Sequence, residues 1–483
     1  MLQNLTVADL LGRVDSALGN GLERLTTTHH RRRLRRIGWL RALDAPPGGW
    51  AESDPPPRPG NELEVIVDGA DALPQIADVI ERARSHVWLA GWHFSPDFRL
   101  RGEGPTLREL LAEVAERVEV RVLAWAGAPL PLFHPDRSEV RDVRAELTTG
   151  TRVRCALDAR ERPLHCHHEK LVIVDGETAF VGGIDLTTLA GDRFDSTTHP
   201  QRPGLGWHDA TTRLRGPALA DVADHFRLRW HEVTGESLAA GDPPGRAGEV
   251  EVQVVRTVPE SIYDSLPRGD FRILESYLRA LHSAERLIYL ENQFLWSPEI
   301  VNVLAHKLRS PPTDDFRLLV ILPGKPKSGA EDTRGQIGVL VDADQGEGRF
   351  LACTLHQRGE GGRPVYAHAK IGVVDDQWLT VGSANLNEHS LFNDTEMNVV
   401  VHDPALAQGT RLRLWAEHLE CDPGELEGGP AQIVDTIFRP RGEEQLARRR
   451  RGEALTHKLV KLPERSRRSA RVLGPLSGFL VDG

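Results

Sequence analysis

Short apolar runs alternate with helical patterns along most of this chain. Residues 87–90 read Val-Trp-Leu-Ala and residues 120–123 read Val-Arg-Val-Leu, with a helical pattern over 107–118 between them. The order recurs later, with strands expected at 287–290 and 318–322, and helices expected at 217–231, 270–283, 298–308 and 405–419. This alternation predicts an α/β fold with two similar lobes, each a mainly mixed β-sheet flanked by helices.

The ends of the chain have a different character. Residues 5–25 place apolar side chains at helical spacing, which predicts an amphipathic helix. A basic run at 29–36 and a Pro/Gly-rich linker follow, and arginines crowd the last part of the chain. We therefore expect an N-terminal segment with helix, basic run and linker at 1–60, a first lobe at 61–238, a second lobe at 239–425 and an Arg-rich tail at 426–483.

Composition narrows the classes of function. The net charge of −10 and a pI near 6.1 do not fit a nucleic-acid partner, which calls for a basic surface. The four cysteines form no CxxC pair, so reduced thiols are expected. The chain shows no signal peptide and no apolar stretch of transmembrane length, so we expect a full-length cytoplasmic protein. The basic segments would contact anionic lipid headgroups, at about 1 kcal/mol per residue, or form a solvated helix face.

The pattern His-x-Lys-x-x-x-x-Asp occurs twice. Its copies start at His168 and His368, which lie 200 positions apart, and a glycine follows each histidine by 14 positions, at Gly182 and Gly382. The other members of the two copies are Lys170, Asp175, Lys370 and Asp375. One copy could be accidental. Two copies with matched glycines predict a duplicated unit that builds one site from two halves.

The motif residues suit the binding of a phosphoryl group. On a β-strand, the histidine and the lysine two positions later point to the same face. Small residues after each motif would let an anion approach the backbone. Ser383 and Asn385 offer neutral donors there, and Lys170 and Lys370 offer charge. We therefore expect these four residues to bind the substrate phosphate.

Two acids and two histidines complete the predicted chemistry. Asp209 and Glu396 follow the motifs, and a buried carboxylate on one ring nitrogen fixes the tautomer of a histidine. One histidine attacks phosphorus and the other protonates the departing alkoxide. Protein cations then neutralise the phosphate, so no cofactor and no metal are expected.

Several of these residues also have other interpretations. Asp175 and Asp375 cap their strands more readily than they perform chemistry. The run from His165 to His168 resembles a metal cluster, but neighbouring side chains on a strand point to opposite faces and do not converge. Trp92, Tyr289 and Trp378 are core residues more often than substrate contacts.

The duplicated motif resembles the signature of the phospholipase D superfamily. The similarity covers roughly residues 62–420 and is nearest to eukaryotic-type phosphatidylcholine phospholipases D and their bacterial relatives. It rests on the two motifs and on these stretches: Gly91-Trp92-His93-Phe94-Ser95-Pro96, His167-His168-Glu169-Lys170, Gly182-Gly183-Ile184-Asp185-Leu186, Trp207-His208-Asp209 and Tyr289-Leu290-Glu291-Asn292-Gln293-Phe294.

The resemblance implies a site at the interface of the lobes and a role for each residue. His168 would be the nucleophile that forms a phosphohistidine, and His368 the general acid. Asp185 stands where many members carry asparagine, and its carboxylate would repel the phosphate unless it pairs with a neighbour.

The implied function is hydrolysis of the headgroup phosphodiester of glycerophospholipids to phosphatidic acid, with transphosphatidylation. A cardiolipin-synthase-like phosphatidyltransferase is the nearest alternative. A nuclease of the same superfamily fits the acidic charge poorly, and an inert membrane adaptor does not need the full motif set that this chain carries. The oligomeric state is left open.

Overall fold

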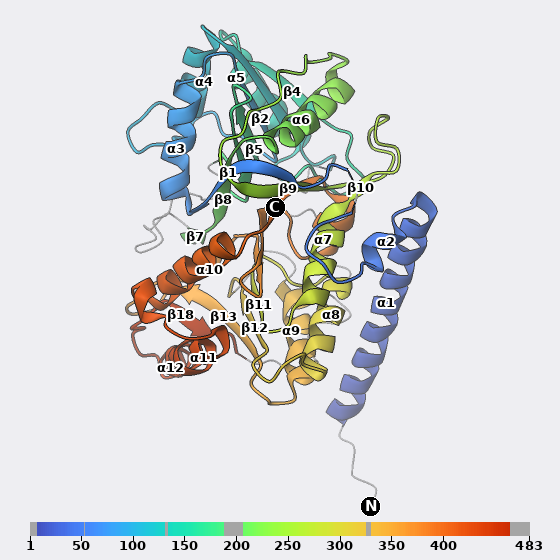
Figure 1. Cartoon of the computed structure of the whole chain (residues 1–483), viewed down its shortest axis with the longest axis vertical. Helices are drawn as coiled ribbons and strands as arrows, with labels where there is room; N and C mark the ends of the chain where they lie inside the picture. The colour runs from blue at the N-terminus through green and yellow to red at the C-terminus, as the bar shows by residue number, and fades with distance from the viewer. Residues whose placement is uncertain (1–6, 53, 131–133, 188–205, 325–329, 464–483) are drawn as a thin grey trace, which may run out of the picture.

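The computed structural model describes residues 7–52, 54–130, 134–187, 206–324 and 330–463. Its strands form two sheets that lie one above the other in Figure 1 and meet at β1 and β9. Helices flank both sheets, so the predicted α/β fold with two similar lobes is confirmed. The predicted boundaries between the four segments stay predictions.

The first sheet runs in the order β4-β3-β2-β5-β6-β8-β1. The neighbours β2, β3 and β4 are parallel, and the other neighbours are antiparallel. The strands are β1 (Arg58–Val67), β2 (His86–Gly91), β3 (Glu119–Trp125), β4 (Arg154–Asp158), β5 (Leu171–Val174), β6 (Thr178–Gly182) and β8 (Ala210–Arg215). The strand β5 that follows the first motif therefore lies in the middle of the sheet.

The second sheet repeats this order as β13-β12-β11-β15-β16-β17-β9. Its strands are β9 (Val250–Val258), β11 (Leu287–Glu291), β12 (Arg317–Ile321), β13 (Phe350–His356), β15 (Ile371–Val374), β16 (Trp378–Gly382) and β17 (Glu396–His402). The edge strands β1 and β9 pair antiparallel, which joins the two sheets about a twofold-like axis. Short strands complete the set: β7 (Gly206–His208), β10 (Asp270–Phe271), β14 (Pro364–Ala367) and β18 (Leu459–Lys461).

Helices cover both faces of the joined sheets. The helices of the first half are α3 (Gly69–Glu81), α4 (Leu107–Ala115), α5 (Arg137–Thr148) and α6 (Leu219–Thr234). Those of the second half are α7 (Arg272–Ser283), α8 (Pro298–Arg309), α9 (Ala330–Asp344) and α10 (Pro404–Leu419). Apolar residues of α6 and α10, such as Trp230 and Trp415, share one buried cluster with both sheets. The other helices enclose two further clusters on the opposite faces, which gives a layered α/β core.

The last part of the described chain packs against the second sheet. It contains the 3-10 helix η2 (Pro423–Glu425), α11 (Pro430–Ile433), the π-helix η3 (Val434–Phe438) and α12 (Arg439–Arg450), whereas the π-helix η1 (His389–Asn393) lies between β16 and β17. The strand β18 pairs with β13. The end of the predicted Arg-rich tail, residues 464–483, lies outside the described residues.

The N-terminal helix is longer than the sequence predicted. Helix α1 (Val7–Ile37) continues through the basic run, and α2 (Leu40–Leu43) follows it. Figure 1 shows α1 alongside α7 and α8. Docking explains the extension: the His30 ring stacks on Phe392 at 3.8 Å, and Arg33 forms an ion pair with Glu260 at 2.7 Å. Part of the basic run is therefore buried against the second half.

No helix in the described ranges is both long enough and apolar enough to cross a membrane.

Candidate active site

The two motifs lie immediately before equivalent strands at the centres of the two sheets. His168 and Lys170 come just before β5, and His368 and Lys370 just before β15. The prediction that these pairs lie within the strands was therefore wrong by a few residues. All residues of β5 and β15 are buried and hydrogen-bonded on both sides, so they anchor the motifs firmly. The motif backbone is left free to pair with the other half of the molecule.

Backbone hydrogen bonds cross between the halves in the same way at both motifs. The Thr395 carbonyl accepts the N–H groups of His168 and Glu169 at 2.9 and 3.2 Å. The His208 carbonyl accepts the N–H groups of His368 and Ala369 at 2.8 and 3.1 Å. Next to this second contact, β7 pairs in parallel with β14 of the second half. Each motif is therefore clamped by a segment from the opposite half.

The same crossing brings each acid to the histidine of the other half. His168 Nδ1 lies 3.1 Å from Glu396 Oε1, and His368 Nδ1 lies 2.6 Å from Asp209 Oδ2. All four residues are at most 5% exposed. Each acid therefore orients its histidine ring through Nδ1. The four residues predicted to perform the chemistry thus form two matched pairs at the interface of the halves.

The acids are buried, and their environment shifts their protonation. Burial raises the pKa of Glu396 to about 8, while Lys170 opposes the shift. Burial also raises the pKa of Asp209, against the opposing charge of Lys370. A carboxyl group with a raised pKa gains stability when a neighbouring imidazole becomes positively charged. Positive charge on the neighbouring imidazole would favour the ionised form of each acid, and the ionised acid would in turn stabilise that charge.

The two lysines belong to the same electrostatic site. Each interacts with the other, and the interaction with Lys170 helps to lower the pKa of Lys370 to about 8, although burial is the larger cause. Lys170 forms an ion pair with Asp185 at 3.3 Å, and Lys370 donates to Gln293 Oε1 at 3.4 Å. Burial raises the pKa of Asp185, and the nearby lysine opposes this. Asp185 thus has the pairing partner that the sequence analysis required of it.

The predicted phosphate ligands of the second half have different surroundings. Asn385 donates to Gln293 Oε1 at 3.3 Å, and its own Oδ1 is buried with no hydrogen-bond partner in the described ranges. The Ser383 hydroxyl donates to Glu396 and accepts the Met397 N–H at 3.1 Å. The Ser383 hydroxyl therefore holds Glu396, and its role as a phosphate ligand stays a prediction. Asn385, Lys170 and Lys370 remain as predicted ligands.

The aspartates that end the motifs are remote from this chemistry. Asp175 accepts the backbone N–H groups of Ser85 and His86 just before and at the start of β2. Asp375 does the same for Arg286 and Leu287 at β11. Each carboxylate ties the end of a motif strand to the start of its neighbour. These contacts fit the strand-capping interpretation of Asp175 and Asp375 rather than a catalytic one.

The glycines after the motifs serve packing rather than access for an anion. A Cβ on Gly182 would lie 2.3 Å from the Cα of Thr211, and one on Gly382 would lie 2.1 Å from Asn398 Oδ1. A Cβ on Gly183 would lie 2.2 Å from Asp209 Oδ1. These positions let β6 and β16 approach the strands that follow the acids.

The sequence does not identify residues that contact the site only after the chain has folded. Gln293 accepts from both Lys370 and Asn385, and its only signal in the sequence is its place in the family-like stretch Tyr289-Leu290-Glu291-Asn292-Gln293-Phe294. His208 lies between Asp68 at 2.9 Å and Glu291 at 2.8 Å, directly before Asp209. The nearby acids hold the pKa of His208 well above its usual value, although burial opposes them. No spacing in the sequence connects these residues.

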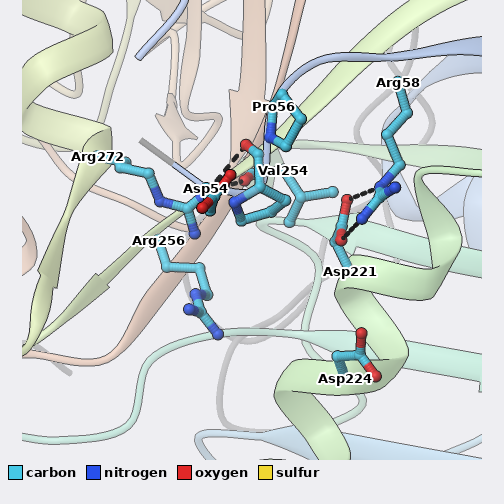
Figure 2. A pocket seen from close by; sticks show the side chains of 9 residues that line it. Asp54, Pro56, Arg58, Asp221, Asp224, Val254, Arg256 and Arg272 are labelled. Atoms are coloured by element: carbon cyan, nitrogen blue, oxygen red, sulfur yellow. Dashed lines mark hydrogen bonds and ion pairs between the residues drawn. The ribbon is translucent and has the colours of Figure 1, made fainter. Parts of the chain in front are cut away.

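An open pocket of about 330 Å³ lies apart from the histidines, between the segment before β1, helix α6 and strand β9. Figure 2 shows the Arg58–Asp221 pair and the Arg256 side chain in it. The Arg256 guanidinium lies 3.0 Å from His225 Nδ1, and His225 Nε2 lies 2.7 Å from Glu169 Oε2. A chain of contacts from Arg256 through His225 therefore links the pocket to Glu169, and none of the predicted site residues lines the pocket.

Comparisons with known proteins agree with the site. The family model "Cardiolipin synthase, PLD-like domain" matches residues 277–415. Phospholipase D A of Dictyostelium discoideum is 25% identical over 469 residues, with 76% of this chain and 36% of that protein covered. The major cardiolipin synthase ClsA of Bacillus subtilis is 26% identical, with 72% and 67% covered. These likenesses support membership of the phospholipase D superfamily.

Further comparisons show how much of each relative this chain covers. Phospholipase D2 of Bos taurus is 25% identical, with 75% of this chain and 52% of that protein covered. The chain thus spans between about a third and two thirds of these three relatives. A solved phosphatidylserine synthase of Haemophilus influenzae has a TM-score of 0.55 at 14% identity, covering 86% of this chain and 98% of that one. That likeness concerns the fold alone.

Proposed function

We propose that this protein is a phosphodiesterase that cleaves the headgroup phosphodiester of glycerophospholipids through a phosphohistidine. The observation that carries the proposal is the crossed pair of contacts, His168 with Glu396 and His368 with Asp209. Two histidines, each held at Nδ1 by a buried acid of the other half, form the acid–base pair that a two-step phosphoryl transfer needs.

The first step forms the covalent intermediate. His168 Nε2 attacks phosphorus, and the bond from phosphorus to the headgroup oxygen breaks. His368 Nε2 gives its proton to the departing alkoxide, so the headgroup oxygen leaves as a neutral hydroxyl group. Glu396 stabilises the positive charge that develops on His168 as the N–P bond forms. The assignment of nucleophile and acid follows the order of the family motifs.

The second step restores the free enzyme. His368, now neutral, accepts a proton from water, and the resulting oxygen nucleophile attacks phosphorus. The N–P bond breaks and phosphatidic acid leaves. An alcohol in place of water gives a new phosphatidyl ester by the same proton transfers. Lys170, Lys370 and Asn385 would hold the non-bridging oxygens in both steps, because charged and amide donors stabilise the charge that builds there.

A phosphatidyltransferase of the cardiolipin synthase kind is the second candidate. The family model and the relative from Bacillus subtilis favour it. Both candidates share the intermediate and differ only in the acceptor. The basic positions of α1 and α12 would bring either enzyme to anionic lipid surfaces, at about 1 kcal/mol per residue.

Product analysis tests the proposal and separates the candidates. The protein is incubated with vesicles of phosphatidylcholine or phosphatidylglycerol, with and without a primary alcohol, and products are identified by mass. We expect phosphatidic acid without alcohol and a phosphatidyl alcohol with it. Cardiolipin from phosphatidylglycerol with little hydrolysis would favour the transferase. His168→Asn should abolish every product, and full turnover by a pure His168→Asn protein would refute the assignment.

A further inference from the structure

Three side chains outside the predicted chemistry converge where the two halves meet. His165 lies three residues before His168 in the first half. His389 begins η1, and Asp394 follows the end of η1 in the second half. His389 and Asp394 are 2% and 0% exposed, while the His165 side chain is 18% exposed. The cluster is therefore nearly closed, with His165 on its open side.

The separations within the cluster suit coordination of one ion. His165 Nδ1 lies 2.9 Å from His389 Nδ1 and 3.4 Å from Asp394 Oδ1. All three ligand atoms lie within 4.8 Å of one another. Nitrogen and oxygen ligands bind a divalent transition metal at about 2.0–2.2 Å. At those bond lengths, the two observed separations correspond to angles of about 90° and 110° at one ion.

Proton counting favours an ion over a set of hydrogen bonds. Two neutral imidazoles offer only one proton between their facing Nδ1 atoms, and the carboxylate offers none. Asp394 Oδ1 already accepts the Cys166 N–H at 2.9 Å. Asp394 Oδ2 is buried and has no hydrogen-bond partner in the described part of the chain. A buried carboxylate with an unpartnered oxygen is costly unless a cation compensates it.

We propose that His165, His389 and Asp394 form a binding site for a divalent transition metal, with zinc as the ion whose chemistry fits best. Two imidazoles and one carboxylate match its preference for nitrogen and oxygen ligands. The open side at His165 leaves room for a water molecule as a further ligand. The contiguous run from His165 to His168 still does not converge, because His167 bonds Thr395 at 2.8 Å and His168 bonds Glu396.

The ion would act as a positioning element. It would join the segment that leads into His168 to the segment that leads, two residues after Asp394, into Glu396. These two segments carry the partners of one histidine–acid pair. The ion takes no part in the transfer steps proposed above, so the inference stands independently of the proposed function.

Metal content measures the site directly. The full chain, freed of any histidine tag, is stripped with a chelator, reloaded with zinc, desalted and measured by mass spectrometry. We expect about one zinc per chain in the wild type and a large loss in both His165→Asn and His389→Asn. His282→Asn is a matched control, because His282 bonds the Ala45 carbonyl outside the cluster at 3.0 Å. His165→Asn should fold normally because its side chain is partly exposed.

A second readout identifies the ligands. Zinc should raise the melting temperature of the wild type and of His282→Asn but not of His165→Asn. X-ray absorption of the zinc protein should show only nitrogen and oxygen neighbours. Absence of stoichiometric zinc, zinc retained in both cluster variants, or a sulfur ligand would each overturn the proposal. An active enzyme that binds no zinc would overturn this site and leave the proposed function intact.

Discussion

Asp209→Asn is the substitution that most sharply tests the role of the crossed acids. Asp209 Oδ2 lies 2.6 Å from His368 Nδ1, while its Oδ1 accepts the Ala210 N–H at 2.7 Å. Asparagine has a single oxygen for these two donors. If that oxygen stays on Ala210, the amide NH₂ faces His368 Nδ1 and forces the proton onto Nε2. If it stays on His368, the NH₂ opposes the Ala210 N–H.

The expected loss follows from the lost charge-assisted bond and the wrong tautomer. A hydrogen bond to a charged group contributes about 1.5–3 kcal/mol, which corresponds to about 10- to 150-fold in rate. The reversed tautomer adds to this, because a neutral imidazole with its proton on Nε2 cannot accept the proton of water in the second step. We therefore expect kcat to fall by at least about 100-fold, with a smaller effect on KM.

Asp175→Asn is the matched control. It makes the same change in the first motif, but its carboxylate bonds backbone N–H groups at the start of β2. It should lower the melting temperature and leave kcat per folded molecule close to that of the wild type. Headgroup release from phospholipid vesicles and thermal unfolding measure the two effects. Equal kcat values for Asp209→Asn and the wild type would refute the role of the crossed acid.

Two further predictions follow from the site. The rate kcat/KM should fall as the pH rises through about 8, because the Lys370 pKa is lowered to about 8 and the neutral amine holds phosphate poorly. Lys370→Arg should flatten this alkaline limb, and an unchanged limb would show that another group titrates. Gly183→Ala should abolish turnover, because its Cβ would lie 2.2 Å from Asp209 Oδ1. Gly102→Ala, with nothing within 4 Å of the new Cβ, should retain wild-type turnover, and equal activity of both variants would contradict the packing argument.

The repeated motif made much of the fold predictable. Strands such as residues 87–90 and 318–322 are short apolar runs, and this composition predicts that both of their faces are buried. Asp209 and Glu396 were found because each follows its motif in a matched position. The basic run was read as separate from the first helix, because its burial depends on Phe392 and Glu260, which lie far away in the sequence.

The contacts that cross between the two halves could not be predicted from the sequence. The sequence around Glu396 does not indicate whether its carboxyl group contacts His168 or His368. That contact depends on the pairing of β1 with β9 and of β7 with β14. The contact of Ser383 with Glu396 also depends on the tertiary fold and has no local signal in the sequence. Gln293 and the partners of His165 likewise come together only through the tertiary fold.

The central claim is that His168 carries the phosphoryl group and His368 moves the proton. A phosphatidyl ester of p-nitrophenol tests it, since this leaving group departs without a general acid. His368→Asn should release about one nitrophenolate per enzyme in a burst and then stall, because no base activates water. The phosphatidyl group should then remain covalently bound to His168. His168→Asn should give no burst. A burst from His168→Asn, or a phosphatidyl group bound to any residue other than His168, would contradict the account.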